Sequence, residues 1–203
     1  MKKFISRLFS RKDRFLNVFH IIGLADATSQ TFEDELDCLS RHAANRGDAL
    51  EIGTRQGVSA VHIVSRLRPD AKLYCVDPWA DRKGKRNPSF DIAMRHFRRS
   101  RVTERVIVLR GFSQAMESQM PPSFDFVFVD GDHSYQGIKT DWGIVCRRLR
   151  VGGVVCLHDT TTPADAPDRT PESCRFYREV IAPDKNFRHL ETYYSMNVLQ
   201  RVS

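Results

Sequence analysis

Apolar and polar residues follow two different spacings in the larger part of the chain. From residue 48 onward, short apolar runs rich in Val, Ile and Phe are separated by segments whose apolar residues recur every three or four positions. The short runs predict buried strands and the longer spacing predicts helices, so their alternation indicates βαβ units and a parallel sheet. The predicted strands cover 49–52, 73–76, 106–109, 124–129 and 154–157, and the predicted helices cover 58–67, 88–101, 113–120 and 135–149.

The end of the chain extends this pattern. We expect Gly152-Gly153 to stop the last of those helices before the fifth strand begins. A further helix is predicted over 172–181, followed by two closing strands over 187–194 and 196–202. The junction at Ser195-Met196 is too poor in turn-forming residues to locate the reversal between these strands.

The first part of the chain has an amphipathic pattern. Between Phe4 and Ile22, apolar residues recur at helical spacing opposite a basic face, and six of the first 20 residues are Lys or Arg. The apolar stripe of this predicted helix needs a cover, which the sequence leaves open between the domain itself, a second subunit in a homodimer, and an anionic membrane surface. We therefore expect a helical extension over residues 1–45 and one domain over 46–203.

Composition narrows the class of protein. The 203 residues carry a net charge of +7, but no nucleic-acid-binding module is recognisable, so we expect no nucleic-acid partner. The five cysteines are odd in number and lack CxxC spacing, which favours a reducing cytoplasm and argues against structural zinc. No apolar run is long enough to cross a bilayer, so we expect a cytoplasmic protein, with peripheral membrane contact left open.

The first predicted strand leads into a glycine-containing turn. Glu51-Ile52-Gly53-Thr54-Arg55-Gln56-Gly57-Val58-Ser59 joins this strand directly to a helix. Such a turn lets a ligand approach the backbone and the amino end of the helix. It is not the GxGxxG turn of dinucleotide-binding enzymes, because Arg55 and Val58 occupy the second and third glycine positions.

The second predicted strand ends at an acidic residue. Asp77 is followed by Pro78-Trp79, and a carboxylate at this strand end can accept hydrogen bonds from both hydroxyls of a ribose. Trp79 then has two interpretations, a side chain that flanks an adenine ring or a plain core residue.

Six short motifs occur in a fixed order along the chain: 51–59, Val76-Asp77-Pro78-Trp79, Gly111-Phe112-Ser113, Phe128-Val129-Asp130-Gly131-Asp132-His133-Ser134-Tyr135, Gly152-Gly153 and His158-Asp159. In this order they resemble the class I S-adenosylmethionine-dependent methyltransferases. The VDGDHSY motif is similar to that of the branch related to macrocin and catechol O-methyltransferases. The resemblance covers roughly residues 46 to 160 and implies an α/β fold with a Rossmann-like, doubly wound, mostly parallel sheet.

The resemblance also implies a cofactor site. Glu51 would lie near the methionine end of S-adenosylmethionine, and Asp77 would bind the ribose hydroxyls. Ser113 would approach the adenine, a role compatible with capping the following helix. The remaining residues implied for this site are Gly53, Thr54, Gly57, Ser59, Pro78, Trp79 and Asp130.

A divalent cation is a second implied ligand. In the metal-dependent O-methyltransferases the corresponding strand ends hold Mg²⁺, and the matching residues here are Asp130, His158 and Asp159. The match departs from the family at His158, because Mg²⁺ prefers oxygen ligands. The sequence leaves open Mg²⁺, a softer divalent cation, and no metal.

Methyl transfer to a hydroxyl needs a group that takes the hydroxyl proton. Asp132 and His133 are the candidate catalytic bases, and a histidine can accept a proton near neutral pH. The alternative is that these two residues only shape the loop. Together these features predict O-methylation of a small hydroxylated or sugar-containing acceptor.

Two other functions remain in competition. One is a nicotinamide-nucleotide-binding oxidoreductase, which the glycine pattern disfavours. The other is a non-catalytic binding protein, which would need no acidic and imidazole groups at the strand ends.

Overall fold

The computed structural model describes residues 27–29, 31–80, 87–162 and 170–203. The amphipathic pattern over residues 4–22 lies outside these ranges. Within them, no helix is both long enough and apolar enough to cross a membrane.

In the described part of the chain, seven strands form a single sheet in the order β3-β2-β1-β4-β5-β7-β6. The strands are β1 (Ala49–Ile52), β2 (Leu73–Asp77), β3 (Val106–Arg110), β4 (Phe124–Val129), β5 (Leu149–Leu157), β6 (Phe187–Tyr193) and β7 (Met196–Arg201). The first five are parallel, and β7 pairs antiparallel with both β5 and β6. The predicted doubly wound, Rossmann-like sheet is confirmed, and the order of the strands reverses between β1 and β4, where such sheets bind ligands.

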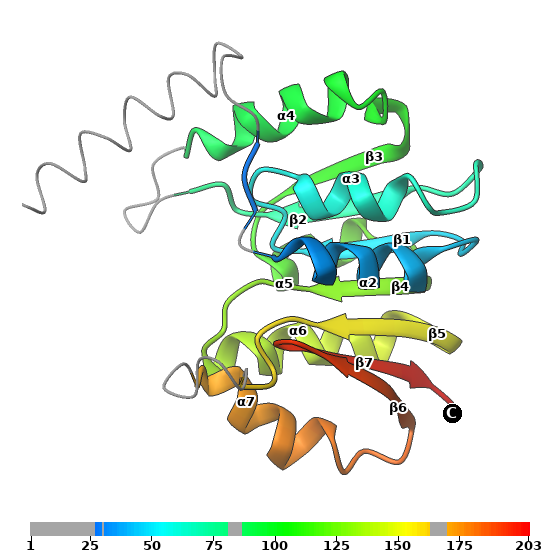
Figure 1. Cartoon of the computed structure of the whole chain (residues 1–203), viewed down its shortest axis with the longest axis vertical. Helices are drawn as coiled ribbons and strands as arrows, with labels where there is room; N and C mark the ends of the chain where they lie inside the picture. Colours follow the sequence, from blue (N-terminus) through cyan, green and yellow to red (C-terminus); the bar gives the residue numbers. More distant parts are fainter. Residues whose placement is uncertain (1–26, 30, 81–86, 163–169) are drawn as a thin grey trace, which may run out of the picture.

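Helices cover both faces of the sheet, as Figure 1 shows. The helices α2 (Glu33–Ala43), α3 (Val58–Val64) and α4 (Ser89–Arg99) share one apolar core with the sheet. On the other face lie α5 (Ser113–Met116), α6 (Tyr135–Arg148) and α7 (Glu172–Phe176), and a π-helical turn, Tyr177–Ile181, continues α7.

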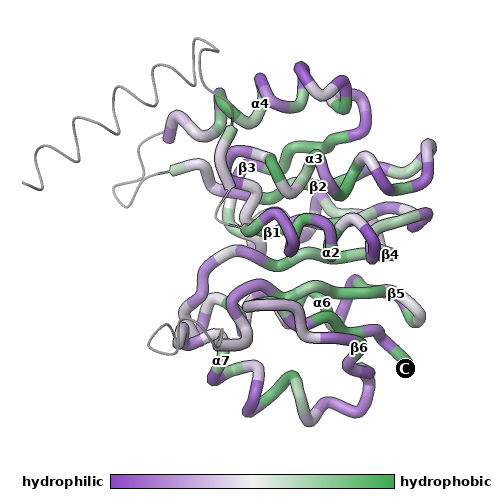
Figure 2. Tube along the Cα trace, viewed as in Figure 1, coloured by the Kyte–Doolittle hydropathy of each residue, from purple (hydrophilic) through white to green (hydrophobic). Residues whose placement is uncertain are grey.

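The central strands are apolar at consecutive positions because both of their faces are buried. In β4, Phe126 and Phe128 belong to the core beneath α2 and α3, whereas Val127 and Val129 belong to the core beneath α6. This explains why the strands appear in the sequence as continuous apolar runs rather than as alternating patterns. Figure 2 shows the same hydrophobic strands through the middle of the molecule.

The structure corrects the expectation for Gly152-Gly153. The helix α6 ends at Arg148, and Leu149 already has extended backbone and pairs with Phe124 of β4. The two glycines therefore lie inside β5, beside a shift in its register with β4. Pairing with the neighbouring strand, rather than the glycines, stops the helix.

Two further features were not placed from the sequence. Residues 33–43 form α2, whose Leu39 and Cys38 are fully buried in the core. The reversal between β6 and β7 is a two-residue turn at Tyr194-Ser195, with Tyr194 at φ 53° and Tyr193 paired with Met196. This turn lies at the carboxyl end of β5, where Thr160 N–H donates to the Ser195 carbonyl oxygen.

Candidate active site

The glycine turn after β1 allows two strand ends to approach closely. Gly53 has φ 96°, and a Cβ atom there would lie only 2.1 Å from the carbonyl oxygen of Asp130, at the end of β4. At the start of α3, Gly57 has φ 79°, and a Cβ atom there would lie 2.5 Å from the ring of Phe97. Both positions therefore need glycine, for the left-handed backbone and for the space.

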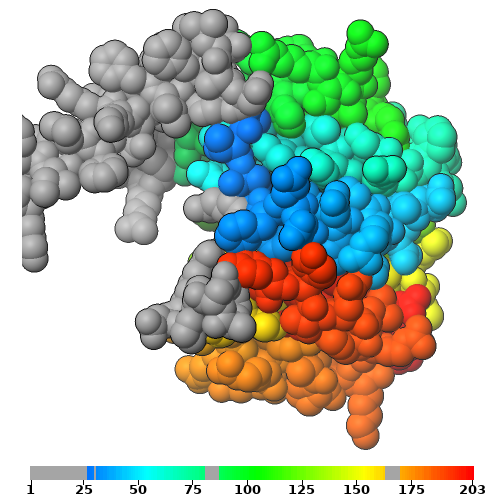
Figure 3. Space-filling view, in the orientation of Figure 1, coloured from blue at the N-terminus to red at the C-terminus, as the bar shows by residue number. Residues whose placement is uncertain are grey.

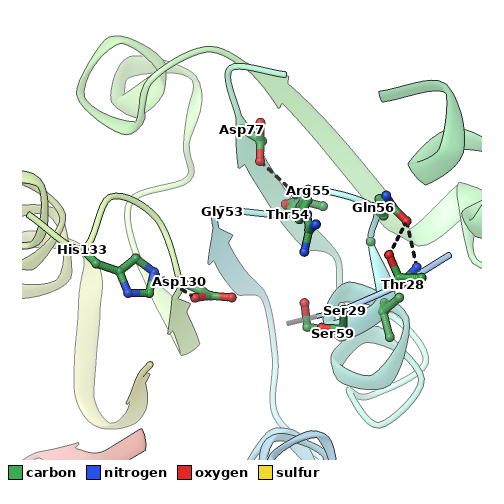
Figure 4. Close-up of a pocket in the computed structure, with 12 residues that line it drawn as sticks. Thr28, Ser29, Gly53, Thr54, Arg55, Gln56, Ser59, Asp77, Asp130 and His133 are labelled. Carbon is green, nitrogen blue, oxygen red and sulfur yellow. Dashed lines mark hydrogen bonds and ion pairs between the residues drawn. The ribbon is translucent and has the colours of Figure 1, made fainter. Parts of the chain in front are cut away.

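A first cavity, of about 210 Å³, opens over this turn. Figure 4 shows that residues of the turns after β1 and β4 and the last residue of β2 face it, together with a segment that precedes α2. Its lining residues are Thr28, Ser29, Gly53, Thr54, Arg55, Gln56, Gly57, Val58, Ser59, Asp77, Asp130 and His133. Seven of these residues were expected from the sequence to bind the cofactor or to act in catalysis, namely Gly53, Thr54, Gly57, Ser59, Asp77, Asp130 and His133.

A second cavity, of about 360 Å³, shares Gly53 and Asp77 with the first. It extends over the ends of β2 and β3 and along the start of α6. It is lined by Ile52, Gly53, Val76, Asp77, Pro78, Gly111, Phe112, Ser113, Gln114, Gly131, Asp132, Gln136, Gly137, Thr140 and Asp141. Because the two cavities meet at Gly53 and Asp77, one elongated ligand can span both.

Asp77 lies at this junction with its carboxylate held in place. One oxygen accepts the backbone N–H of Arg55 at 2.8 Å, and the other accepts that of Trp79 at 2.6 Å. Burial raises the pKa of Asp77, although these backbone donors oppose the rise. A carboxylate has about four lone-pair positions, so the two backbone contacts leave acceptor capacity for hydroxyl groups of a ligand.

Trp79 is not brought to either cavity. Its indole is 1% exposed, donates from Nε1 to the Arg55 carbonyl oxygen at 2.7 Å, and packs edge-on against Phe90. This position fits the interpretation of Trp79 as a core residue. Its hydrogen bond to Arg55 helps to hold the glycine turn after β1 in place.

Glu51 lies beneath the turn and lines neither cavity. It is fully buried and accepts a 2.6 Å hydrogen bond from the hydroxyl of Ser59, which does face the first cavity. Burial raises the pKa of Glu51 to about 7, against the lowering effect of the Ser59 hydroxyl. Glu51 therefore contacts the first cavity indirectly, through Ser59.

Four ionisable side chains form a network at the ends of β4 and β5. Asp130 Oδ1 lies 2.9 Å from His158 Nδ1 and 3.3 Å from His133 Nε2. On its other side, His133 Nδ1 lies 3.0 Å from Asp159 Oδ2. The structure thus brings together Asp130, His133, His158 and Asp159, which the sequence had placed only at neighbouring strand ends.

Glu35 completes this network from α2, at a position that no sequence motif indicated. Its carboxylate is fully buried, lies 3.3 Å from His158 Nε2, and accepts hydrogen bonds from the backbone and hydroxyl of Ser195. The only sequence signal was an acidic residue within the apolar face of a short helix, at a position distant in sequence from every motif.

The carboxylates hold both histidines in their protonated forms. Contacts with Asp130 and Asp159 raise the pKa of His133 to about 9. Burial lowers the pKa of His158, but Asp130 and Glu35 outweigh it and raise the value to about 10. His133 is therefore mostly an imidazolium at neutral pH, in contrast to the nearly unperturbed base that the sequence suggested.

Asp132 faces the second cavity instead of the first. Its two carboxylate oxygens accept the backbone N–H and the hydroxyl of Ser134, at 3.0 Å and 2.9 Å, and the Ser134 hydroxyl in turn accepts Gly137 N–H at the start of α6. These contacts match the loop-shaping interpretation of Asp132.

The types of donor atom in the network determine which metal ion it suits. Among the described residues, Asp130, His133 and His158 offer donor atoms within 4.8 Å of one another. Two imidazole nitrogens and one carboxylate do not suit Mg²⁺, which takes oxygen ligands, but they suit ions such as Fe²⁺, Ni²⁺ or Zn²⁺. The residues therefore fit a softer divalent ion better than Mg²⁺.

Ser113 and an unpredicted partner lie at the far end of the second cavity. The Ser113 hydroxyl donates to Asp141 Oδ1 at 2.5 Å, and both side chains are buried. Burial raises the pKa of Asp141 to about 6. Asp141 lies on α6, and no motif of the sequence had pointed to it.

Comparison with known proteins gives a family for this arrangement. A family model described as a methyltransferase domain matches residues 50–160, which is more than half of the chain and includes the ends of β1, β2, β4 and β5.

Solved structures share the fold at low sequence identity. The O-methyltransferase TomG from Streptomyces achromogenes, in complex with SAM, is 21% identical, with a TM-score of 0.66 over 87% of this chain and 82% of that chain. An O-methyltransferase from Bacillus cereus, in complex with SAH, is 22% identical, with a TM-score of 0.65 over 92% and 90%. A putative rRNA-methylase from Clostridium thermocellum is 12% identical, with a TM-score of 0.61 over 87% and 100%. The fold alone therefore does not select the acceptor.

Proposed function

The chain belongs to the methyltransferase-domain family and is a methyltransferase, and on this premise we propose that it uses S-adenosylmethionine to methylate a hydroxyl group of a small hydroxylated or sugar-containing acceptor. The observation that carries the proposal is the pair of cavities that meet at Gly53 and Asp77. When bound, S-adenosylmethionine supplies a methyl group on a positively charged sulfur.

The residues of the two cavities divide the binding of this cofactor between them. Asp77 would accept hydrogen bonds from the ribose hydroxyls at the junction, and Ser113 with Asp141 would face the adenine in the second cavity. The turn at Gly53 and the hydroxyls of Thr54 and Ser59 would line the amino-acid end in the first cavity. This division agrees with the rule that ligands of doubly wound sheets bind across the carboxyl ends of the strands.

His133 is the residue proposed to take the acceptor proton. It faces the first cavity beside Asp130, and its side chain is 31% exposed, so a hydroxyl in that cavity can reach it. Since Asp130 and Asp159 hold it as an imidazolium, only the minority neutral form accepts a proton, and the two carboxylates stabilise the product of that transfer. Asp132 is the weaker candidate because its carboxylate holds Ser134, the N-cap of α6.

Binding of the cofactor is the direct test. Calorimetry with S-adenosylhomocysteine should give micromolar-range binding, whereas NAD should give none. A chain that binds NAD and ignores S-adenosylhomocysteine would refute the proposed cofactor.

A metal requirement is tested separately with an acceptor in hand. If a divalent ion takes part, chelation by EDTA abolishes turnover and an added softer ion such as Zn²⁺, Fe²⁺ or Ni²⁺ restores it better than Mg²⁺. If His133 acts alone, EDTA leaves turnover unchanged and His133→Ala lowers it by roughly 10²- to 10⁴-fold.

A further inference from the structure

A second group of possible metal ligands lies on the sheet face covered by α2, away from the two cavities. Cys38 and His42 are four residues apart on α2, and Glu191 lies opposite them on β6. Their donor atoms are all within 4.8 Å of one another, with His42 Nε2 2.5 Å and Cys38 Sγ 3.9 Å from Glu191 Oε1. Figure 3 shows α2 and the β6–β7 hairpin side by side on the surface.

The position of Glu191 depends on an irregularity in β6. Phe187 and Tyr193 have the same parity along the strand, yet Phe187 packs in the core beneath α6 and Tyr193 packs against the core beneath α2. The register of β6 with β7 shifts between His189 and Glu191, and such a shift turns the following side chains to the other face of the sheet. Without this shift Glu191 would point away from Cys38 and His42.

We propose that Cys38, His42 and Glu191 bind a divalent transition ion of the Zn²⁺ type in a structural site distinct from the Asp130–His133–His158 cluster. One sulfur, one imidazole nitrogen and one carboxylate oxygen are three of the ligand types that tetrahedral Zn²⁺ accepts. Ligands four residues apart on a helix face the same side, which is how helices supply two ligands to one ion.

The geometry needs only a small adjustment to accept the ion. With bonds of about 2.0 to 2.3 Å, tetrahedral ligand atoms lie roughly 3.5 Å apart, so the His42–Glu191 contact must open by about 1 Å. The side chains of His42 and Glu191 are 16% and 32% exposed, which leaves an entry path and room for a water as fourth ligand.

The charges of the site also favour an ion. On binding, Cys38 releases one proton, and its thiolate together with the Glu191 carboxylate neutralises the 2+ charge. Arg41, whose side chain is 58% exposed and now contacts the same Glu191 oxygen, can turn to solvent.

The proposed ion would join α2, the first described helix, to β6 at the edge of the sheet. Cys38 lies one helical turn after Glu35, the residue that contacts His158 in the active-site network. An ion at this site would therefore fix the helix that places Glu35.

The test is cobalt substitution in the full-length protein after removal of bound metals. Titration with Co²⁺ should give a near-ultraviolet sulfur-to-cobalt charge-transfer band that saturates at one equivalent and disappears when Zn²⁺ is added. Only a thiolate ligand produces this band, so an ion held by Asp130, His133 and His158 does not contribute to it.

Matched variants assign the band to its residues. Cys38→Ser should abolish it, and Glu191→Gln, a change on an exposed strand that leaves the core intact, should weaken Co²⁺ binding at least tenfold. Cys146→Ser, on the opposite face of the sheet, should leave the band unchanged, as should Asp130→Asn. Circular dichroism confirms that each variant is folded.

Two results would overturn the proposal. One is the absence of the charge-transfer band in the wild-type protein, which would leave His42 and Glu191 as a simple ion pair. The other is a band that persists in folded Cys38→Ser or is unaffected in Glu191→Gln.

Discussion

Glu35 on α2 and His158 at the end of β5 form a buried ion pair, with 3.3 Å between Glu35 Oε2 and His158 Nε2. The side chains are 0% and 3% exposed. The pair therefore connects a helix that precedes the matched methyltransferase region to the centre of the active-site network.

Removing Glu35 should destabilise the protein strongly. Glu35→Ala removes one of the two carboxylates that contact the buried His158, together with the acceptor of Ser195, and breaking a buried pair typically costs about 3 to 5 kcal/mol. Urea denaturation measures the loss, and Glu33→Ala, an exposed position on the same helix, is the control with an expected change below about 0.5 kcal/mol. Equal effects of the two substitutions would show that the buried pair contributes nothing.

Alanine at Gly53 should be far more harmful than alanine at Gly152. Both glycines have positive φ, 96° and 83°, but a Cβ atom would collide with the Asp130 carbonyl only at Gly53, since nothing lies within 4 Å at Gly152. We expect Gly152→Ala to cost about 1 to 2 kcal/mol from backbone strain alone, and Gly53→Ala to cost more and to abolish binding of S-adenosylhomocysteine. Chemical denaturation and calorimetry on the two variants check this, and similar losses in both would mean that the close approach of β1 and β4 is unimportant.

Asp77→Ala should weaken S-adenosylhomocysteine binding at least tenfold. A hydrogen bond to a charged group contributes about 1.5 to 3 kcal/mol, and each 1.4 kcal/mol corresponds to a factor of ten in affinity. Calorimetry provides the measurement, with Asp70→Ala in an exposed position as the matched control. Unchanged affinity in Asp77→Ala would place the ribose elsewhere.

Glu51 should make stability fall as the pH rises. Its pKa in the folded protein, about 7, lies above the ordinary value of 4.5, so between these values the folded state binds more protons than the unfolded state. The contribution of the neutral carboxyl is therefore fully present below about pH 4.5 and is lost as the pH passes through 7, by up to about 3 kcal/mol.

Glu51→Gln removes this dependence. Relative to wild type, the variant should gain stability between pH 5 and pH 8, whereas Glu104→Gln, at an exposed position, should follow wild type at every pH. Denaturant midpoints measured across this range provide the comparison. Parallel curves for wild type and Glu51→Gln would contradict the raised pKa.

Much of the fold follows from local patterns in the sequence. The bounds of β1 and β4 agree with the predicted strands, since consecutive apolar residues flanked by polar turns have few alternatives once both faces of a strand are buried. The methyltransferase family was likewise predicted from the ordered motifs and is confirmed by the family match. The candidate site residues at Gly53, Asp77 and Asp130 could be proposed because parallel strands end at the same edge of the sheet.

Tertiary structure decided what depends on contacts between distant segments. Pairing of Leu149 with Phe124, and not the glycine pair, sets the end of α6. Trp79 is buried and donates a hydrogen bond to the glycine turn, and the carboxylates around His133 raise the pKa of that histidine. Both effects depend on neighbours that no local pattern specifies. Glu35 and Glu191 reach their partners only through the packing of α2 against the sheet and the register shift in β6. The sequence by itself therefore determined which chemical groups lie at the strand ends, and the tertiary structure decided which of those groups meet.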